Sequence, residues 1–245
     1  MDNHLHSISK FTEYFKRHLD EIATISVPSK SLRQKILYVS IIDALSKSIY
    51  PNGKNSRQRF TLFIEQFSNW SDCQRVSLLH LVEALRKSPE PIFQELREYA
   101  VTKYSTFNMG QGNLPSISVD PPMTEVKSKW PKNYEFKFPC GVELASIRHL
   151  DLFYSFRNSL VHELRTPGRG FEVKDDSNPY YLHVMEADAE YEQLFASTQL
   201  VYPVSFCRKL CDDLLNNLKK YLEVNNLDPY ESYNFGTYWI ENLND

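Results

Sequence analysis

Apolar residues recur at intervals of three and four along most of the chain, which is the spacing of a helix that buries one face. Prolines, glycines and capping serines separate these segments. The pattern predicts helices over residues 4–25, 29–50, 57–70, 71–85, 89–104, 142–165 and 203–222. We therefore expect a mainly all-α protein whose helices form an antiparallel bundle.

Two stretches depart from the helical pattern. Residues 105–141 contain prolines and glycines without helical periodicity, which predicts a long irregular insertion. Aromatic residues alternate with charged ones over 134–138, which favours a half-buried strand, although such aromatics could also stack on exposed bases. Residues 170–202 are expected to hold a small β-hairpin, and the whole chain, 1–245, is expected to be one domain.

Composition and charge limit the classes of protein to consider. The chain has 245 residues, of which 42% are hydrophobic and 24% charged, as is usual for a folded protein. The net charge of −3 argues against a generally basic nucleic-acid-binding protein. Any contact with phosphate must come from a local basic patch, and one candidate is available: Arg157, Arg165, Arg169 and Lys174, partly offset by Glu163, Glu172 and Asp175.

Cysteine usage and the start of the chain indicate a cytoplasmic protein. Four scattered cysteines and the lack of an apolar leader after Met1 suggest reduced thiols. Cys207 and Cys211 have the spacing of two metal ligands, but no second pair accompanies them, so we expect packing residues and no metal. The longest apolar run, Ile36 to Leu45, is interrupted and too short to cross a membrane.

The helix expected over 142–165 carries the most informative polar residues. Its apolar residues share one broad face: Phe153, Phe156, Leu160, Val161 and Leu164. Asn158 and His162 are four apart on the opposite face, so their side chains should stack. Arg157 projects into the apolar sector, where a charge needs a partner. Asp43 could hold this guanidinium across the bundle, or could simply pair with Lys47 on a solvated face.

The order Phe-Arg-Asn-Ser-Leu-Val-His-Glu at residues 156–163 resembles the signature of the HEPN superfamily. That signature is an arginine, usually followed by a polar residue, and then a histidine after four to six intervening positions. Four residues separate Arg157 from His162, and Asn158 is the polar residue. The resemblance implies a HEPN-type helical bundle. It also implies a metal-independent endoribonuclease that acts as a homodimer, with two motifs facing each other.

The implied chemistry suits these side chains. RNA carries its own nucleophile, the 2′-hydroxyl, so cleavage needs proton transfer and charge stabilisation but no cofactor. His162 would transfer protons, and Arg157 would stabilise charge on the phosphoryl oxygens. Asn158 would orient the imidazole or bind a phosphate oxygen, and Arg165 and Arg169 would contact RNA phosphates. The products would be 2′,3′-cyclic phosphates.

Other functions remain open at this point. A non-catalytic HEPN-like module would bind RNA, a nucleotide or a protein partner, for example in a toxin or defence system with an antitoxin or other regulatory partner. One toxin branch carries a modified tyrosine two places after the histidine, but this chain has Leu164 there. A purely structural helical protein would pair Arg157 with a buried acid. A hydrolase built on Ser159 and His162 is disfavoured, because adjacent turns of one helix rarely give attack geometry.

Overall fold

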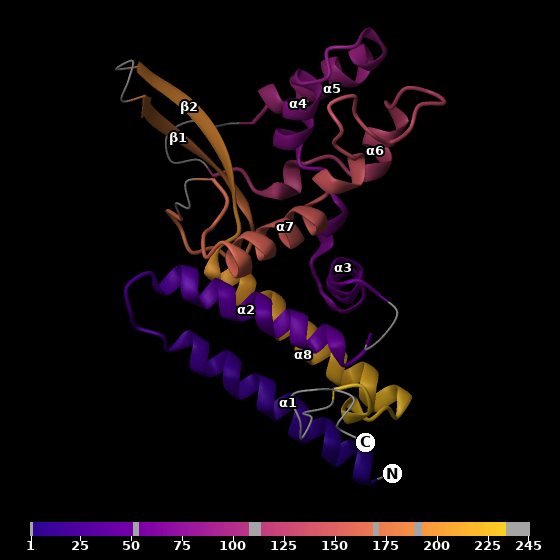
Figure 1. Ribbon diagram of the computed structural model, residues 1–245, viewed down its shortest axis with the longest axis vertical. Coiled ribbons are helices and arrows are strands. Elements are labelled where there is room, and N and C mark those ends of the chain that lie inside the picture. Colours follow the sequence, from indigo (N-terminus) through magenta and orange to yellow (C-terminus); the bar gives the residue numbers. More distant parts are fainter. Residues whose placement is uncertain (1, 51–53, 108–113, 169–171, 189–192, 234–245) are drawn as a thin grey trace. The chain divides into compact units, whose positions relative to one another are not determined.

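The computed structural model describes residues 2–50, 54–107, 114–168, 172–188 and 193–233. This part of the chain is mostly helical and contains one antiparallel pair of strands (Figure 1), which confirms the mainly helical class and the small hairpin. No helix in these ranges is both long enough and apolar enough to cross a bilayer. The elements are α1 (Asp2–Ala23), α2 (Lys30–Lys47), α3 (Ser56–Phe67), α4 (Leu78–Arg86), α5 (Gln94–Ser105), α6 (Met123–Ser128), α7 (His149–His162), β1 (Tyr180–Asp188), β2 (Gln193–Val201) and α8 (Val204–Asn225).

The chain divides into two compact units. The first unit comprises Met1–Asn69 and Arg208–Asp245, and the second comprises Trp70–Cys207. The division falls inside α8, so most of that helix belongs to the first unit. The sequence predicts one domain over the whole chain. The division into two compact units does not test this prediction.

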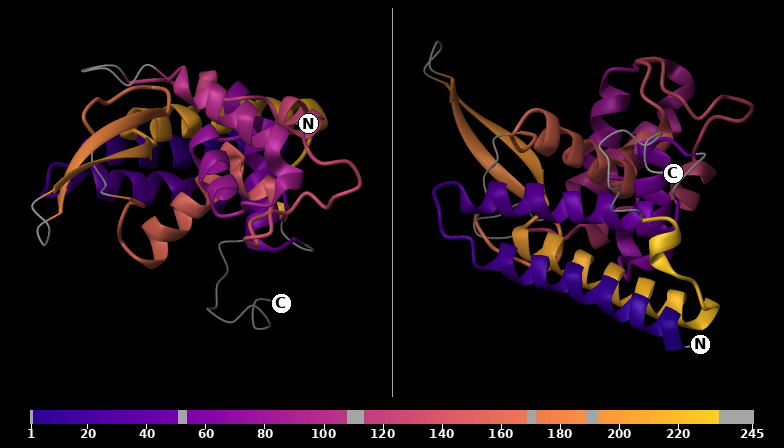
Figure 2. Two further views of the ribbon diagram at one scale, coloured as in Figure 1. Left: turned by 90° about the horizontal axis from the view of Figure 1, so that it is seen from above. Right: turned by 60° about the horizontal axis from the view of Figure 1, so that its bottom comes forward.

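The first unit is built from long helices. Helices α1 and α2 run in opposite directions, with α8 beside them (Figures 1 and 2). Arg208 of α8 donates to the Leu19 carbonyl and to the Asp20 carboxylate of α1, the latter at 2.8 Å. Cys211 lies 3.4 Å from the Tyr38 carbonyl of α2, as a buried packing residue. Because α8 is tied to both helices, it closes the apolar core that they share.

The second unit contains a core around α4 and α5 that includes part of the expected insertion. Val126 of α6, Trp130 and Phe138 are buried in this core. The stretch after residue 113 is therefore a packed segment that includes a short helix, because its few apolar residues are buried in the core. The strand expected over 134–138 is wrong. Phe138 is buried but Phe136 is half exposed, and the segment forms only an isolated bridge between Lys137 and Glu143.

The β-hairpin confirms the prediction for residues 170–202 in its essentials. Strands β1 and β2 pair antiparallel, with Tyr180 opposite Val201 and Tyr181 opposite Leu200. The start of β1 is fixed to the preceding chain, since the Tyr181 amide donates to the Pro115 carbonyl at 2.8 Å. The phenol of Tyr181 is fully buried, so β1 delivers a polar group to the interior of this unit.

Helix α7 is shorter than the 142–165 helix that the sequence predicts. A short 3-10 turn, Leu144–Ile147, precedes it, and Arg148 is extended with ψ 145°. At the other end, Leu164 adopts a left-handed φ of 54°, so it lies beyond the helix and is 66% exposed. The expected place of Leu164 on the buried face is therefore wrong, because the helix stops at His162.

Candidate functional site

The end of α7 presents the Arg-Asn-His motif outward. Phe153, Phe156 and Leu160 are buried and fix the orientation of the helix. His162, the last helical residue, is exposed, and Arg157 is partly exposed. The buried apolar residues thus face the core, while Arg157 and Asn158 are partly exposed and His162 is exposed at the helix end.

The guanidinium of Arg157 lies along the helix surface and reaches the imidazole. Its Nη1 is 3.0 Å from Asn158 Oδ1 and 3.3 Å from His162 Nε2. Its Cζ also lies 6.0 Å from the centre of the Tyr154 ring, within the range of a cation–π contact. The apolar spacing of the helix predicts that Arg157 projects into the apolar sector. The geometry differs because the long side chain bends toward the helix end, where Asn158 holds the guanidinium.

The contact with Arg157 determines the tautomer of His162. A guanidinium only donates hydrogen bonds, so Nε2 of His162 must be the acceptor and the ring proton must lie on Nδ1. The imidazole in this arrangement is therefore neutral. A neutral imidazole is the form that can take a proton from a hydroxyl group.

The expected basic patch is largely neutralised among the described residues. Arg165 forms an ion pair with Glu163 at 2.5 Å, and Lys174 pairs with Asp176 at 2.7 Å. Arg169 lies outside the residues that the structure describes. Exposed pairs of this kind are weak, so a phosphate could replace either carboxylate as the partner.

Asp43 belongs to the first unit and Arg157 to the second. The pairing of these two residues therefore stays a prediction.

A second polar feature, which no spacing in the sequence indicates, is a buried hydrogen-bond network around Asp120. This carboxylate is 1% exposed. Its Oδ2 lies 2.6 Å from both Tyr181 Oη and His149 Nε2, and its Oδ1 accepts from the Leu78 amide at 3.0 Å. The latter bond caps the N-terminus of α4, where a negative charge is favoured by the helix dipole. Asp120 thus joins α4, α7 and β1 of the second unit.

The network continues from Tyr181 to the side chain of His80. Ser77 Oγ lies 2.9 Å from Tyr181 Oη and 2.9 Å from His80 Nδ1. Tyr181 donates its proton to Asp120, so Ser77 must donate to Tyr181, and His80 Nδ1 must then donate to Ser77. Burial and the charge of Asp120 raise the pKa of Tyr181 well above its ordinary value, which keeps this donor protonated. The order of donors leaves Nε2 of His80 without a proton.

Protonation of His80 should destabilise the protein in mild acid. Burial, reinforced by the charge of His149, lowers the pKa of His80 to about 4, below the value near 6.5 of an unfolded histidine. The unfolded chain therefore binds more protons between these two values, and stability present above pH 6.5 is lost as the pH falls toward 4. Between pH 7 and pH 5, wild-type protein should lose about 2 kcal/mol more unfolding free energy than a His80→Phe variant.

Urea unfolding of both proteins at the two pH values measures this difference. Equal losses in wild type and variant would show that the partly buried His80 does not have a lowered pKa.

Comparison of the chain with known protein families, with curated proteins and with solved structures finds no match. A function must therefore be inferred from the residues of the chain itself. Two features of the second unit carry chemistry: the exposed Arg157–His162 pair at the end of α7, and the buried network that ends at His80.

Proposed function

We propose that this chain is a metal-independent endoribonuclease of the HEPN type, with Arg157 and His162 as its catalytic residues. The main support is the contact between the guanidinium and the imidazole, 3.3 Å apart on an accessible helix end. The two residues are five positions apart in sequence, beyond the spacings of three and four at which helical side chains are direct neighbours, so the long Arg157 side chain must reach along the helix to make this contact. A fixed cation beside a neutral imidazole suits cleavage of a phosphodiester by its own 2′-hydroxyl.

The reaction needs no external oxidant or cofactor. The 2′-oxygen attacks the phosphorus while its proton passes to an imidazole nitrogen. The bond from phosphorus to the 5′-oxygen breaks, and that oxygen takes up a proton as it leaves. The products are a 2′,3′-cyclic phosphate and a free 5′-hydroxyl.

Substrate binding would also free the base. Arg157 occupies Nε2 of His162 at rest. A phosphate group attracts a guanidinium more strongly than a neutral imidazole does, because the pair is charge-assisted. When Arg157 turns to the phosphate, Nε2 becomes available for the 2′-hydroxyl proton. Asn158, which accepts from the same guanidinium nitrogen at 3.0 Å, would limit how far Arg157 moves.

A homodimer is part of this proposal. One imidazole cannot easily act as base and acid in a single in-line step, because the attacking and leaving oxygens lie on opposite sides of the phosphorus, and the base must start without the proton that the acid must start with. A second copy of His162 from a partner subunit would supply the acid. The mass of the protein in solution, and its dependence on concentration, tests this part separately.

Cleavage of RNA in EDTA tests the proposed activity. Purified protein should cut a single-stranded RNA oligonucleotide in the presence of EDTA and leave the DNA oligonucleotide of the same sequence intact, because DNA lacks the 2′-hydroxyl. Binding of RNA without cleavage would instead support the non-catalytic HEPN-like module. Cleavage of both nucleic acids would contradict attack by the 2′-hydroxyl.

A further inference from the structure

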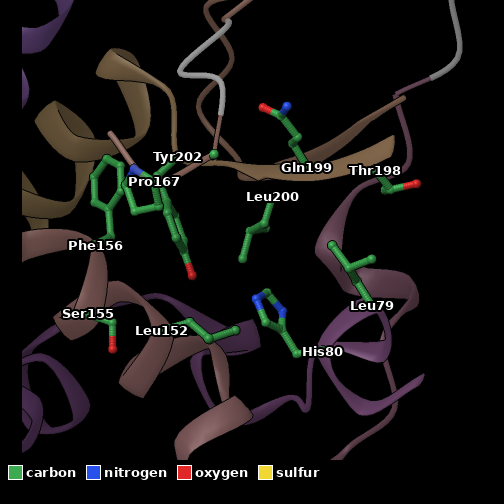
Figure 3. Close-up of a pocket in the computed structure, with 11 residues that line it drawn as sticks. Leu79, His80, Leu152, Ser155, Phe156, Pro167, Thr198, Gln199, Leu200 and Tyr202 are labelled. Carbon is green, nitrogen blue, oxygen red and sulfur yellow. The ribbon is translucent and has the colours of Figure 1, made fainter. Parts of the chain in front are cut away.

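The buried network of Asp120 ends at a pocket that the proposed ribonuclease site does not use. This pocket lies within the second unit, between α4, α7 and β2 (Figure 3), and its volume is about 260 Å³. Its walls are largely apolar. They are formed by Leu79, His80, Leu152, Phe156, Leu200 and Tyr202, and the exposed residues Ser155, Pro167 and Gly168 contribute to its rim.

The imidazole of His80 points into this pocket toward Leu200 (Figure 3). The other polar groups around the pocket are engaged or turned away. The Tyr202 hydroxyl donates to the His149 carbonyl at 3.2 Å, and Thr198 Oγ1 accepts from Tyr104 at 3.1 Å. The Gln199 amide points away from the ring of His80 (Figure 3). Among the described side chains that line the pocket, His80 is therefore the one that points a polar ring atom into it.

The network behind His80 determines what this group can bind. The chain of donors runs from His80 through Ser77 and Tyr181 to Asp120, with contacts of 2.9, 2.9 and 2.6 Å. Each donor is committed to the next acceptor, so Nδ1 of His80 carries the proton and Nε2 carries a lone pair. At neutral pH the ring is uncharged, since burial lowers its pKa to about 4. The pocket thus offers a hydrogen-bond acceptor and no charge.

We infer that this pocket binds a small, largely apolar ring compound that carries one N–H or O–H donor, and that His80 Nε2 accepts this hydrogen bond. The size agrees with one or two fused rings. A cavity of about 150 Å³ is enough for benzene, while drug-sized ligands occupy about 300 Å³ or more. This inference does not depend on the ribonuclease proposal, because it uses neither Arg157 nor His162.

Indole and benzothiophene provide a matched pair of probes. They have nearly the same shape, but sulfur replaces the N–H group in benzothiophene. Calorimetric titration of the full chain at pH 7 would give the ratio of their dissociation constants. The preference of wild type for indole over benzothiophene should be about fivefold larger than that of His80→Phe. The variant keeps an aromatic ring at this position but lacks the acceptor. His6→Ala, a change at an exposed histidine of the first unit, should keep the wild-type ratio.

Two results would overturn the inference: no binding of indole at millimolar concentration, or equal ratios in wild type and His80→Phe. Nitrogen NMR of the wild-type histidines tests it without a variant. The resonances of His80 should show a protonated Nδ1 and a bare Nε2 at pH 7, and the Nε2 resonance should shift when indole is added. A proton on Nε2, or no shift with indole, would contradict the proposed role of His80.

Discussion

Replacement of Asp120 by alanine is expected to lower the free energy of unfolding by about 3–5 kcal/mol. The carboxylate is buried and accepts bonds from Tyr181, His149 and the Leu78 amide. Its removal leaves three buried donors without an acceptor and takes the negative charge from the N-terminus of α4. Such a loss is a large share of the usual stability of a domain, which is about 5–15 kcal/mol.

Urea unfolding followed by circular dichroism measures this loss. Asp176→Ala is the matched control, because Asp176 is an aspartate of the same unit that pairs with exposed Lys174 at 2.7 Å. The control should change stability by less than about 1 kcal/mol. If Asp120→Ala were as mild as the control, Asp120 would not be the centre of a buried network.

Replacement of His162 by alanine is expected to reduce the rate of RNA cleavage by about 10²–10⁴-fold. The variant loses the imidazole that exchanges protons with the substrate, while Arg157 stays to bind the phosphate. RNA binding should therefore change little. The fold should also be preserved, because His162 is exposed at the end of α7 and contributes nothing to the core.

His183→Ala is the control for this change, since His183 is an exposed histidine on β1 with a contact to Thr198 at 3.3 Å. It should cleave RNA at the wild-type rate. Single-turnover cleavage and RNA binding would be measured for all three proteins. Unchanged cleavage by His162→Ala would remove His162 from the mechanism.

The spacing of apolar residues along the chain is enough to predict the helix that carries the candidate site. The spacing of Phe153, Phe156 and Leu160 predicted a helix with a buried face, and these residues are buried in α7. The ends of this helix were less predictable, because Arg148 and Leu164 leave it through backbone angles that the apolar pattern does not encode. The same limit applies to residues 134–138, where alternation suggested a strand but packing on the core produced an irregular segment.

The network around Asp120 was not predictable from spacing. Asp120 is 42 residues from Leu78, 29 from His149 and 61 from Tyr181. Three separate elements bring these groups together, and each lies in a segment whose own pattern is ordinary. Only tertiary packing shows that their polar atoms share one carboxylate. The Arg157–His162 pair, by contrast, lies on one helix, where short spacing carries the information.

The chemical nature of the cut ends tests the ribonuclease proposal most directly. Wild-type protein and RNA would be incubated in EDTA, and the fragments analysed by mass spectrometry. The proposal predicts 2′,3′-cyclic phosphates at the new 3′ ends and hydroxyl groups at the new 5′ ends. Fragments that carry 5′-phosphates and 3′-hydroxyls, or RNA that remains intact, would contradict it.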